Sequence, residues 1–218
     1  MKNALGQSAG RIADFFRHYR LPLYIMVRPF DGFYAMKYLK EGTLKISFLN
    51  VILLLISYAI NDQYASLIVN PQNPLTLNSL WHWVMIVTAL ILFCVSNWSV
   101  TSLMDGEGKL KDIFMSVTYA MTPLILTIVP ATILSNFLSQ EEAGFYFMLM
   151  SVGVAYFIFL VFCGLVVVHN YGAGKAIFSI VLTFFALLAI VFLITLLLSL
   201  WQQLYVFVYS IYTELMFR

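Results

Sequence analysis

The sequence predicts an all-α integral membrane protein with five transmembrane helices, its N-terminus in the cytoplasm and its C-terminus outside. The chain of 218 residues is 62% hydrophobic and only 10% charged, with a mean hydropathy of +0.91. A soluble domain of this size has too little interior to bury so much apolar surface. Five apolar runs approach the ~20 residues that are needed to cross a bilayer.

The distribution of basic residues predicts the orientation of the five runs. When the runs alternate across a membrane, every lysine and arginine except Arg218 falls on one side. Cytoplasmic loops retain such residues, so this side is expected to face the cytoplasm. The net charge of +2 is too small to indicate nucleic-acid binding.

Interfacial tryptophans help to place the spans. Trp81 opens the second run, Trp98 closes it, and Trp201 ends the fifth, as expected of side chains at the headgroup level. Residues 201–218 form an aromatic tail that we expect on the outer surface, with a sixth crossing as the alternative. The expected spans are 44–60, 80–100, 113–134, 145–168 and 177–200.

The first 43 residues are expected to form basic, amphipathic pieces. One helical face ends at Pro22, and a second helix is predicted over 32–41, capped by Asp31 and ended by Gly42. Such pieces lie on an anionic inner leaflet or offer a docking surface to a cytoplasmic partner. Six basic residues of the N-terminal region and three charged residues of the loop after the second span are candidates for this partner or lipid surface. They are Arg11, Arg17, Arg20, Arg28, Lys37, Lys40, Asp105, Glu107 and Lys109.

The sequence shows few residues in patterns that are typical of ion transport, metal binding or catalysis. The five expected spans hold no Asp, Glu or Arg, which argues against ion-coupled transport. No carboxylate or thiol is spaced to complete a metal site with His82 or His169, so both are predicted to be interfacial anchors. No serine has a base at a suitable spacing. We therefore expect no enzyme, no cofactor and no metal.

Polar and helix-breaking residues inside the spans predict packing or a hinge. Pro123 and Pro130 are expected to interrupt the third span, with threonine hydroxyls bonding the freed carbonyls. Asn97 near the inner end of the second span and Gly153 in the fourth indicate close helix packing. Asp112 is placed to cap the start of the third span.

Four segments, in this order and spacing within five spans, resemble the YIP family of Ypt/Rab-interacting membrane proteins. They are RPFDGF at 28–33, LMDGEG at 103–108, YAMTPL at 119–124 and HNYGAGKA at 169–176. The resemblance implies five helices, a cytoplasmic N-terminus and no known catalytic activity, and the loops are most similar to prokaryotic members. Some of these are thought to accompany transport systems, including ABC-type importers.

The leading hypothesis is a non-enzymatic accessory or scaffold subunit in a bacterial plasma membrane. Its partners would be the bilayer with its anionic inner leaflet and another membrane protein, such as an ABC-type transporter, or a second copy of the chain. One alternative is a small permease or channel that uses the Pro-bent third span. Another is a membrane-trafficking protein that contacts a small GTPase, although the N-terminal region is shorter here than in many trafficking members.

Overall fold

Residues 19–70 and 79–217 are described by the structure, a computed structural model, and every regular element among them is helical. A helical segment over 19–27 precedes seven further helices. These are α2 (Pro29–Lys37), α3 (Leu44–Tyr64), α4 (Ser79–Leu103), α5 (Leu110–Ala120), α6 (Thr122–Ser135), α7 (Ala143–His169) and α8 (Ala173–Met216).

The prediction of five membrane-length apolar helices is confirmed. They are α3, α4, the α5–α6 pair, α7 and α8. Each is longer than its predicted span. In particular α3 has 21 residues and therefore covers ~32 Å, enough to cross the hydrocarbon layer.

The third span bends at one of its two prolines. Pro123 cannot donate to the carbonyl of Tyr119, and α5 gives way to α6 at Met121. The freed carbonyl instead accepts a hydrogen bond from the Thr122 hydroxyl at 2.7 Å. Pro130, by contrast, lies inside α6, so the prediction that it also interrupts the span was wrong.

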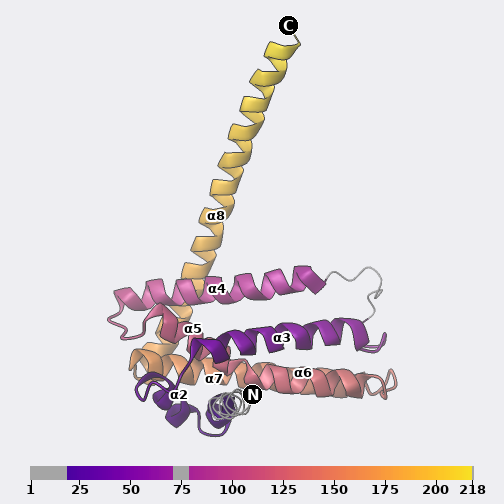
Figure 1. Ribbon diagram of the computed structural model, residues 1–218, viewed down its shortest axis with the longest axis vertical. Helices are drawn as coiled ribbons and strands as arrows, with labels where there is room; N and C mark the ends of the chain where they lie inside the picture. The colour runs from indigo at the N-terminus through magenta and orange to yellow at the C-terminus, as the bar shows by residue number, and fades with distance from the viewer. Residues whose placement is uncertain (1–18, 71–78, 218) are drawn as a thin grey trace, which may run out of the picture.

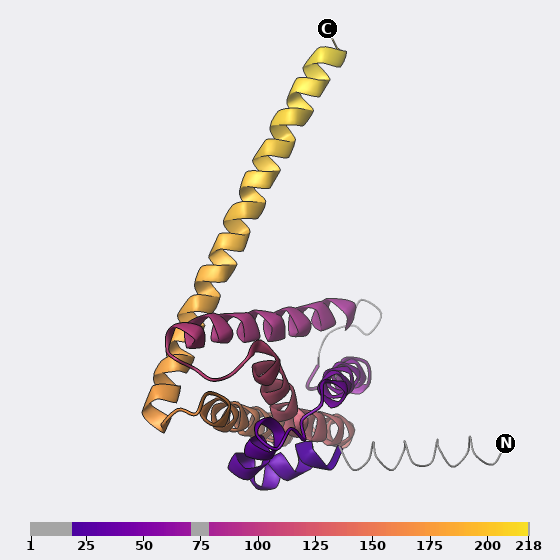
Figure 2. The same ribbon diagram turned by 60° about the vertical axis from the view of Figure 1, so that its left-hand side comes forward.

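The bundle is built around α5. Seven of its eleven residues are buried, and it packs against α3, α4 and α7. Figure 1 shows α3 beside the α6–α7 pair, with α4 above them, and Figure 2 shows α5 between α4 and α7. The largest side chains that are wholly enclosed include Tyr119, Phe33, Ile113 and Leu160.

Helix α8 leaves this bundle. Its buried residues are Ala176, Ser179 and Thr183, all near its start, and the rest of the helix projects past α4 (Figures 1 and 2). At 1.5 Å per residue its 44 residues span ~66 Å, about twice the hydrocarbon thickness of a bilayer. The expected end of the fifth helix at 200 is therefore not observed, because residues 201–216 continue α8 without a turn.

The N-terminal region packs on the bundle differently from the prediction. Residues 19–27 are helical through Pro22, so this proline does not end the helix. The next helix begins at Pro29 rather than at 32, because a proline is favoured in the first turn; Asp31 lies inside that turn and caps nothing. This helix ends at Lys37, five residues before Gly42.

Candidate functional site at the basic end of the bundle

Three segments that are far apart in the sequence meet at one end of the bundle, which we call the basic end. They are the end of α2, the α4–α5 loop over 104–109 and the α7–α8 loop over 170–172. The carboxylate of Glu107 joins all three: it accepts hydrogen bonds from the Tyr38 hydroxyl at 3.2 Å, from the Asn170 amide at 3.2 Å and from the Lys37 ammonium at 3.5 Å. The loops predicted to share one side of the membrane thus contact one another.

Lys37 is the second connection between these segments. Its ammonium donates to the carbonyl oxygen of Val168 at 2.7 Å, near the end of α7, and lies 4.5 Å from the centre of the Tyr38 ring. The Lys37 side chain is only 11% exposed. This lysine therefore holds α2 against α7 and is not a free surface charge.

A buried polar chain lies beneath this surface and links α7, α4 and α8. His169 Nε2 lies 3.1 Å from Asn97 Oδ1, and the Asn97 amide donates to the Thr183 hydroxyl at 3.0 Å. Because the amide oxygen can only accept, His169 carries its proton on Nε2. The prediction that His169 is an interfacial anchor was wrong: its side chain is wholly buried and its contacts are with protein.

The two glycines of the α4–α5 loop are needed for this packing. A Cβ on Gly106 would lie 2.7 Å from His169 Nδ1, and one on Gly108 would lie 2.6 Å from His169 Cε1 and 2.7 Å from Val168. Real side chains do not approach so closely, so only glycine lets the loop cover the imidazole. Sequence analysis did not detect this contact.

Hydroxyl groups of two tyrosines complete the connections. The Tyr119 hydroxyl bonds both the N–H and the carbonyl of Thr43 at 2.9 and 3.1 Å, so α5 holds the start of α3. The Tyr171 hydroxyl donates to the carbonyl of Met104 at 3.1 Å. Residues of three of the four sequence segments noted above, 103–108, 119–124 and 169–176, therefore take part in packing at or near this end.

The remaining predicted residues are distributed over the surface. Arg20, Arg28, Lys40, Asp105 and Lys109 are exposed. Lys40 and Asp105 have left-handed backbone conformations, with φ of 57° and 55°, which turn the chain between helices. The Asp112 carboxylate accepts a hydrogen bond from the backbone N–H of Lys109 at 3.2 Å, as predicted for the start of the third span. Arg11 and Arg17 lie outside the described residues.

Gly153 and Asn97, which were predicted to lie at close helix contacts, both pack against neighbouring helices. Gly153 of α7 packs directly on Thr127 of α6, and a Cβ there would overlap the threonine hydroxyl. Asn97 is buried in the chain described above. At the opposite end of the bundle, Asn61 bonds Thr132 and Tyr146, both at 2.9 Å, which fixes α3 against α6 and α7.

The fixed contacts of Glu107 change its ionisation. The hydrogen bond from Asn170, then that from Tyr38, and the nearby Lys37 ammonium hold the pKa of Glu107 below its ordinary value of 4.5. Folding therefore favours the ionised carboxylate, and its contribution to stability is present above pH 4.5 and is lost as the pH falls through the lowered pKa.

We expect Glu107→Gln to lower the midpoint of thermal unfolding by about 2 °C near neutral pH, a small effect because the group is exposed. The difference from the unmodified chain should shrink as the pH falls through the lowered pKa of Glu107, because the carboxylate then becomes neutral. Thermal unfolding of both detergent-purified proteins at a series of pH values measures this difference in midpoint. Glu41→Gln is the control, since the exposed Glu41 side chain has no hydrogen bond within the described residues. A difference that grows with acidity would contradict the assignment.

An apolar groove of about 770 Å³ opens between α4 and α7, beside the break in the third span. The only polar atom of its side chains is the Tyr58 hydroxyl. Residues from α3, α5, α6 and the start of α8 complete the lining, which includes Leu90, Phe93, Met121, Phe157, Phe162 and Val181.

At the basic end Lys37, Glu107 and His169 thus bond other groups of the protein. Among residues 19–70 and 79–217, no three His, Cys, Asp or Glu side chains are grouped so that they could hold a metal ion. Both cysteines are buried and separate. The bonds of Glu107 join the end of α2 and two loops into one surface.

These features define a multi-pass α-helical membrane protein whose loops close over one end of its bundle. The sequence model of the Yip1 domain family matches residues 23–212, nearly the whole chain. The protein therefore belongs to the YIP family, as the sequence motifs suggested, and this is not a known enzyme family. No curated protein and no solved structure matches the chain.

Proposed function

We propose that this protein is an accessory or scaffold subunit of a bacterial cell membrane. Its basic end faces the cytoplasm and binds another membrane protein, with an ABC-type transporter as the expected class of partner. The anionic lipids of the inner leaflet contact the exposed Arg20 and Arg28.

The observation that carries this proposal is that Glu107 joins the end of α2 and two loops into one surface. Exposed charges of both signs, Lys40, Asp105 and Lys109, stand on backbone that these bonds hold in place. A surface that is ordered before binding loses little conformational entropy when a partner docks. The buried polar groups Asn97, His169 and Thr183 serve this order.

The groove between α4 and α7 supports the accessory role over a permease for polar solutes. Its walls offer one hydroxyl, from Tyr58, and otherwise hydrocarbon. A polar solute would lose its hydration there without replacement, which costs several kcal/mol. An apolar wall at membrane depth is suited to lipid chains or to a partner's helix.

Charge reversal at the basic end tests the proposal. We expect the double variant Lys40→Glu/Lys109→Glu to retain about tenfold less partner than the unmodified chain when it is purified from native membranes in mild detergent. Partner recovery is quantified by mass spectrometry against the amount of tagged chain.

The matched control reverses a charge at the opposite end. Glu141→Lys lies in the α6–α7 loop, far along the bundle from the basic end, and should leave recovery of the partner unchanged. A chain that stays alone at native expression levels would refute the accessory role. Equal loss of partner in the two variants would refute the choice of surface.

A further inference from the structure

The first part of α4 is weakly packed on the bundle. Over residues 79–89 no side chain is buried, and the first buried residue of this helix is Leu90. Leu80 and Trp81 are 66% and 61% exposed. A segment with few buried apolar contacts opens at a low cost in free energy. The start of α4 is therefore freer to move than its second half.

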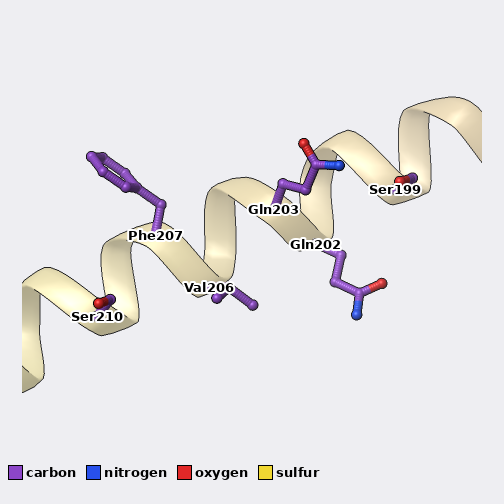
Figure 3. A pocket seen from close by; sticks show the side chains of 6 residues that line it. All are labelled: Ser199, Gln202, Gln203, Val206, Phe207 and Ser210. Carbon is purple, nitrogen blue, oxygen red and sulfur yellow. The ribbon is translucent and has the colours of Figure 1, made fainter.

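Helix α8 does not hold the start of α4. It crosses α4 in the half that ends at Leu103 (Figures 1 and 2), where the Asn97 amide donates to the Thr183 hydroxyl at 3.0 Å. Farther along α8, the shallow hollow shown in Figure 3 is lined by residues of α8 alone, Ser199 and Ser210 among them. A polar contact that holds the start of α4 must therefore come from another helix.

A histidine–aspartate pair joins the start of α4 to the end of α3. His82 Nδ1 lies 2.9 Å from a carboxylate oxygen of Asp62, whose side chain is only 13% exposed. A carboxylate only accepts, so the imidazole donates from Nδ1. Among residues 19–70 and 79–217, no other side-chain hydrogen bond links α3 with α4. Sequence analysis predicted an interfacial anchor at His82 and did not detect this pair.

The pair lies at one end of the apolar groove. Tyr58 of α3 and Ile86 of α4 both line the groove. Asp62 follows Tyr58 by four positions, and His82 precedes Ile86 by four, so each member of the pair lies one helical turn from a lining residue and on the same helix face. Because α3 and α4 run in opposite directions, both turns lead away from the basic end. The pair therefore joins the two helices at the end of the groove that is farther from the basic end.

The strength of this pair depends on pH. Histidine is the side chain that changes its charge between about pH 5 and 8. A hydrogen bond from an imidazolium to a carboxylate is roughly twice as strong as a bond between neutral groups. Tyr58 of α3 and Tyr146 of α7 are the titratable neighbours of Asp62, and tyrosines titrate near pH 10. The α6–α7 loop at this end carries Glu141 and Glu142, and the Glu142 carboxylate is bonded to Ser139.

We propose that the pair of His82 and Asp62 is a pH-dependent latch on the start of α4. When the imidazole is charged, the ion pair holds α4 against α3 and closes this end of the groove. When the imidazole is neutral, the weaker bond releases the start of α4 more often, because no buried side chain retains it. The wall of the groove that α4 provides then moves away from α3.

Distances between spin labels on the full chain in lipid vesicles test the latch. In a background of Cys94→Ala and Cys163→Ala, labelled cysteines replace Leu80 of α4 and Phe145 of α7, which are both exposed. We expect two distances, one for the held and one for the released helix. The ratio of held to released chains should fall about threefold between about pH 5.5 and pH 8, the size expected for a partly exposed ion pair.

The matched control pair of labels replaces Tyr64 of α3 and Phe145. Its distance should not change with pH, because Asn61 holds α3 against α7 through the Tyr146 hydroxyl, and neither group titrates in this range. With the first pair of labels, His82→Gln should remove the pH dependence, since an amide still donates but carries no charge. One unchanged distance at both pH values, an equal pH response in His82→Gln, or a response of the control pair would each overturn the latch. None of these results bears on partner binding at the basic end.

Discussion

Gly164→Val is expected to destabilise the protein by about 3 kcal/mol or more, the upper part of the range for overpacking a core. A Cβ on Gly164 would overlap the Ser116 hydroxyl and lie 3.1 Å from the Phe33 ring. Ser116 belongs to α5 and Phe33 to α2, and both are fully buried. Neither side chain can move into free space, so α7 would be forced away from two helices at once.

Thermal unfolding of the detergent-purified protein, followed by the fluorescence of its four tryptophans, measures the effect. For a chain of this length the midpoint should fall by about 6–12 °C. Gly144→Val is the matched control, because Gly144 lies in the same helix and a Cβ there would meet nothing within 4 Å. Similar midpoints for the two variants would mean that α7 does not pack against α5 and α2 as described.

The helices were predictable because membrane insertion is governed by properties that are local in the sequence. The lengths of the apolar runs predicted five long helices, and all five are present. The break at Pro123 was predictable for the same reason, since a proline removes a bond to a residue four positions earlier. Pro130 shows the limit of this reasoning: α6 continues through it. The orientation of the bundle in the membrane stays a prediction.

The candidate site was predictable only in part, because its bonds join distant segments. Sequence analysis named both Lys37 and Glu107, but 70 positions separate them, and no pattern indicated that they pair. His169 was assigned to the interface because it directly follows the expected fourth span, 145–168. The Gly-Glu-Gly spacing of the α4–α5 loop was the available signal that something packs closely there, and its partner proved to be the imidazole.

The structure also explains why most of the recognisable motifs are found near one end. His169, Gly106 and Gly108 are constrained by one another, while Tyr119 fixes the chain just before α3. A family can retain such residues because they shape a surface, without any of them touching a ligand. Partner specificity would then reside in the exposed charges around them, such as Lys40 and Lys109.

Asn97→Leu is expected to give the second large effect, a loss of about 1–3 kcal/mol, because it removes two interhelical hydrogen bonds at membrane depth. The Asn97 amide is the only described link between His169 of α7 and Thr183 of α8. Without it both ring nitrogens of His169 would be buried and unpartnered, since Nδ1 already has no partner among the described residues. The thermal midpoint should fall by about 2–12 °C.

Asn97→Leu should also weaken the packing of α8 against α4, because the bond between Asn97 and Thr183 is a polar contact between these two helices. Combining Asn97→Leu with Thr183→Val should cost less than the sum of the single changes, since both remove one shared bond. Ser99→Ala is the matched control: Ser99 lies on α4 too, but its hydroxyl bonds only the carbonyl of Val95 in its own helix, at 2.9 Å. Strict additivity of the pair, or an equal loss in Ser99→Ala, would show that α8 is held by apolar packing alone.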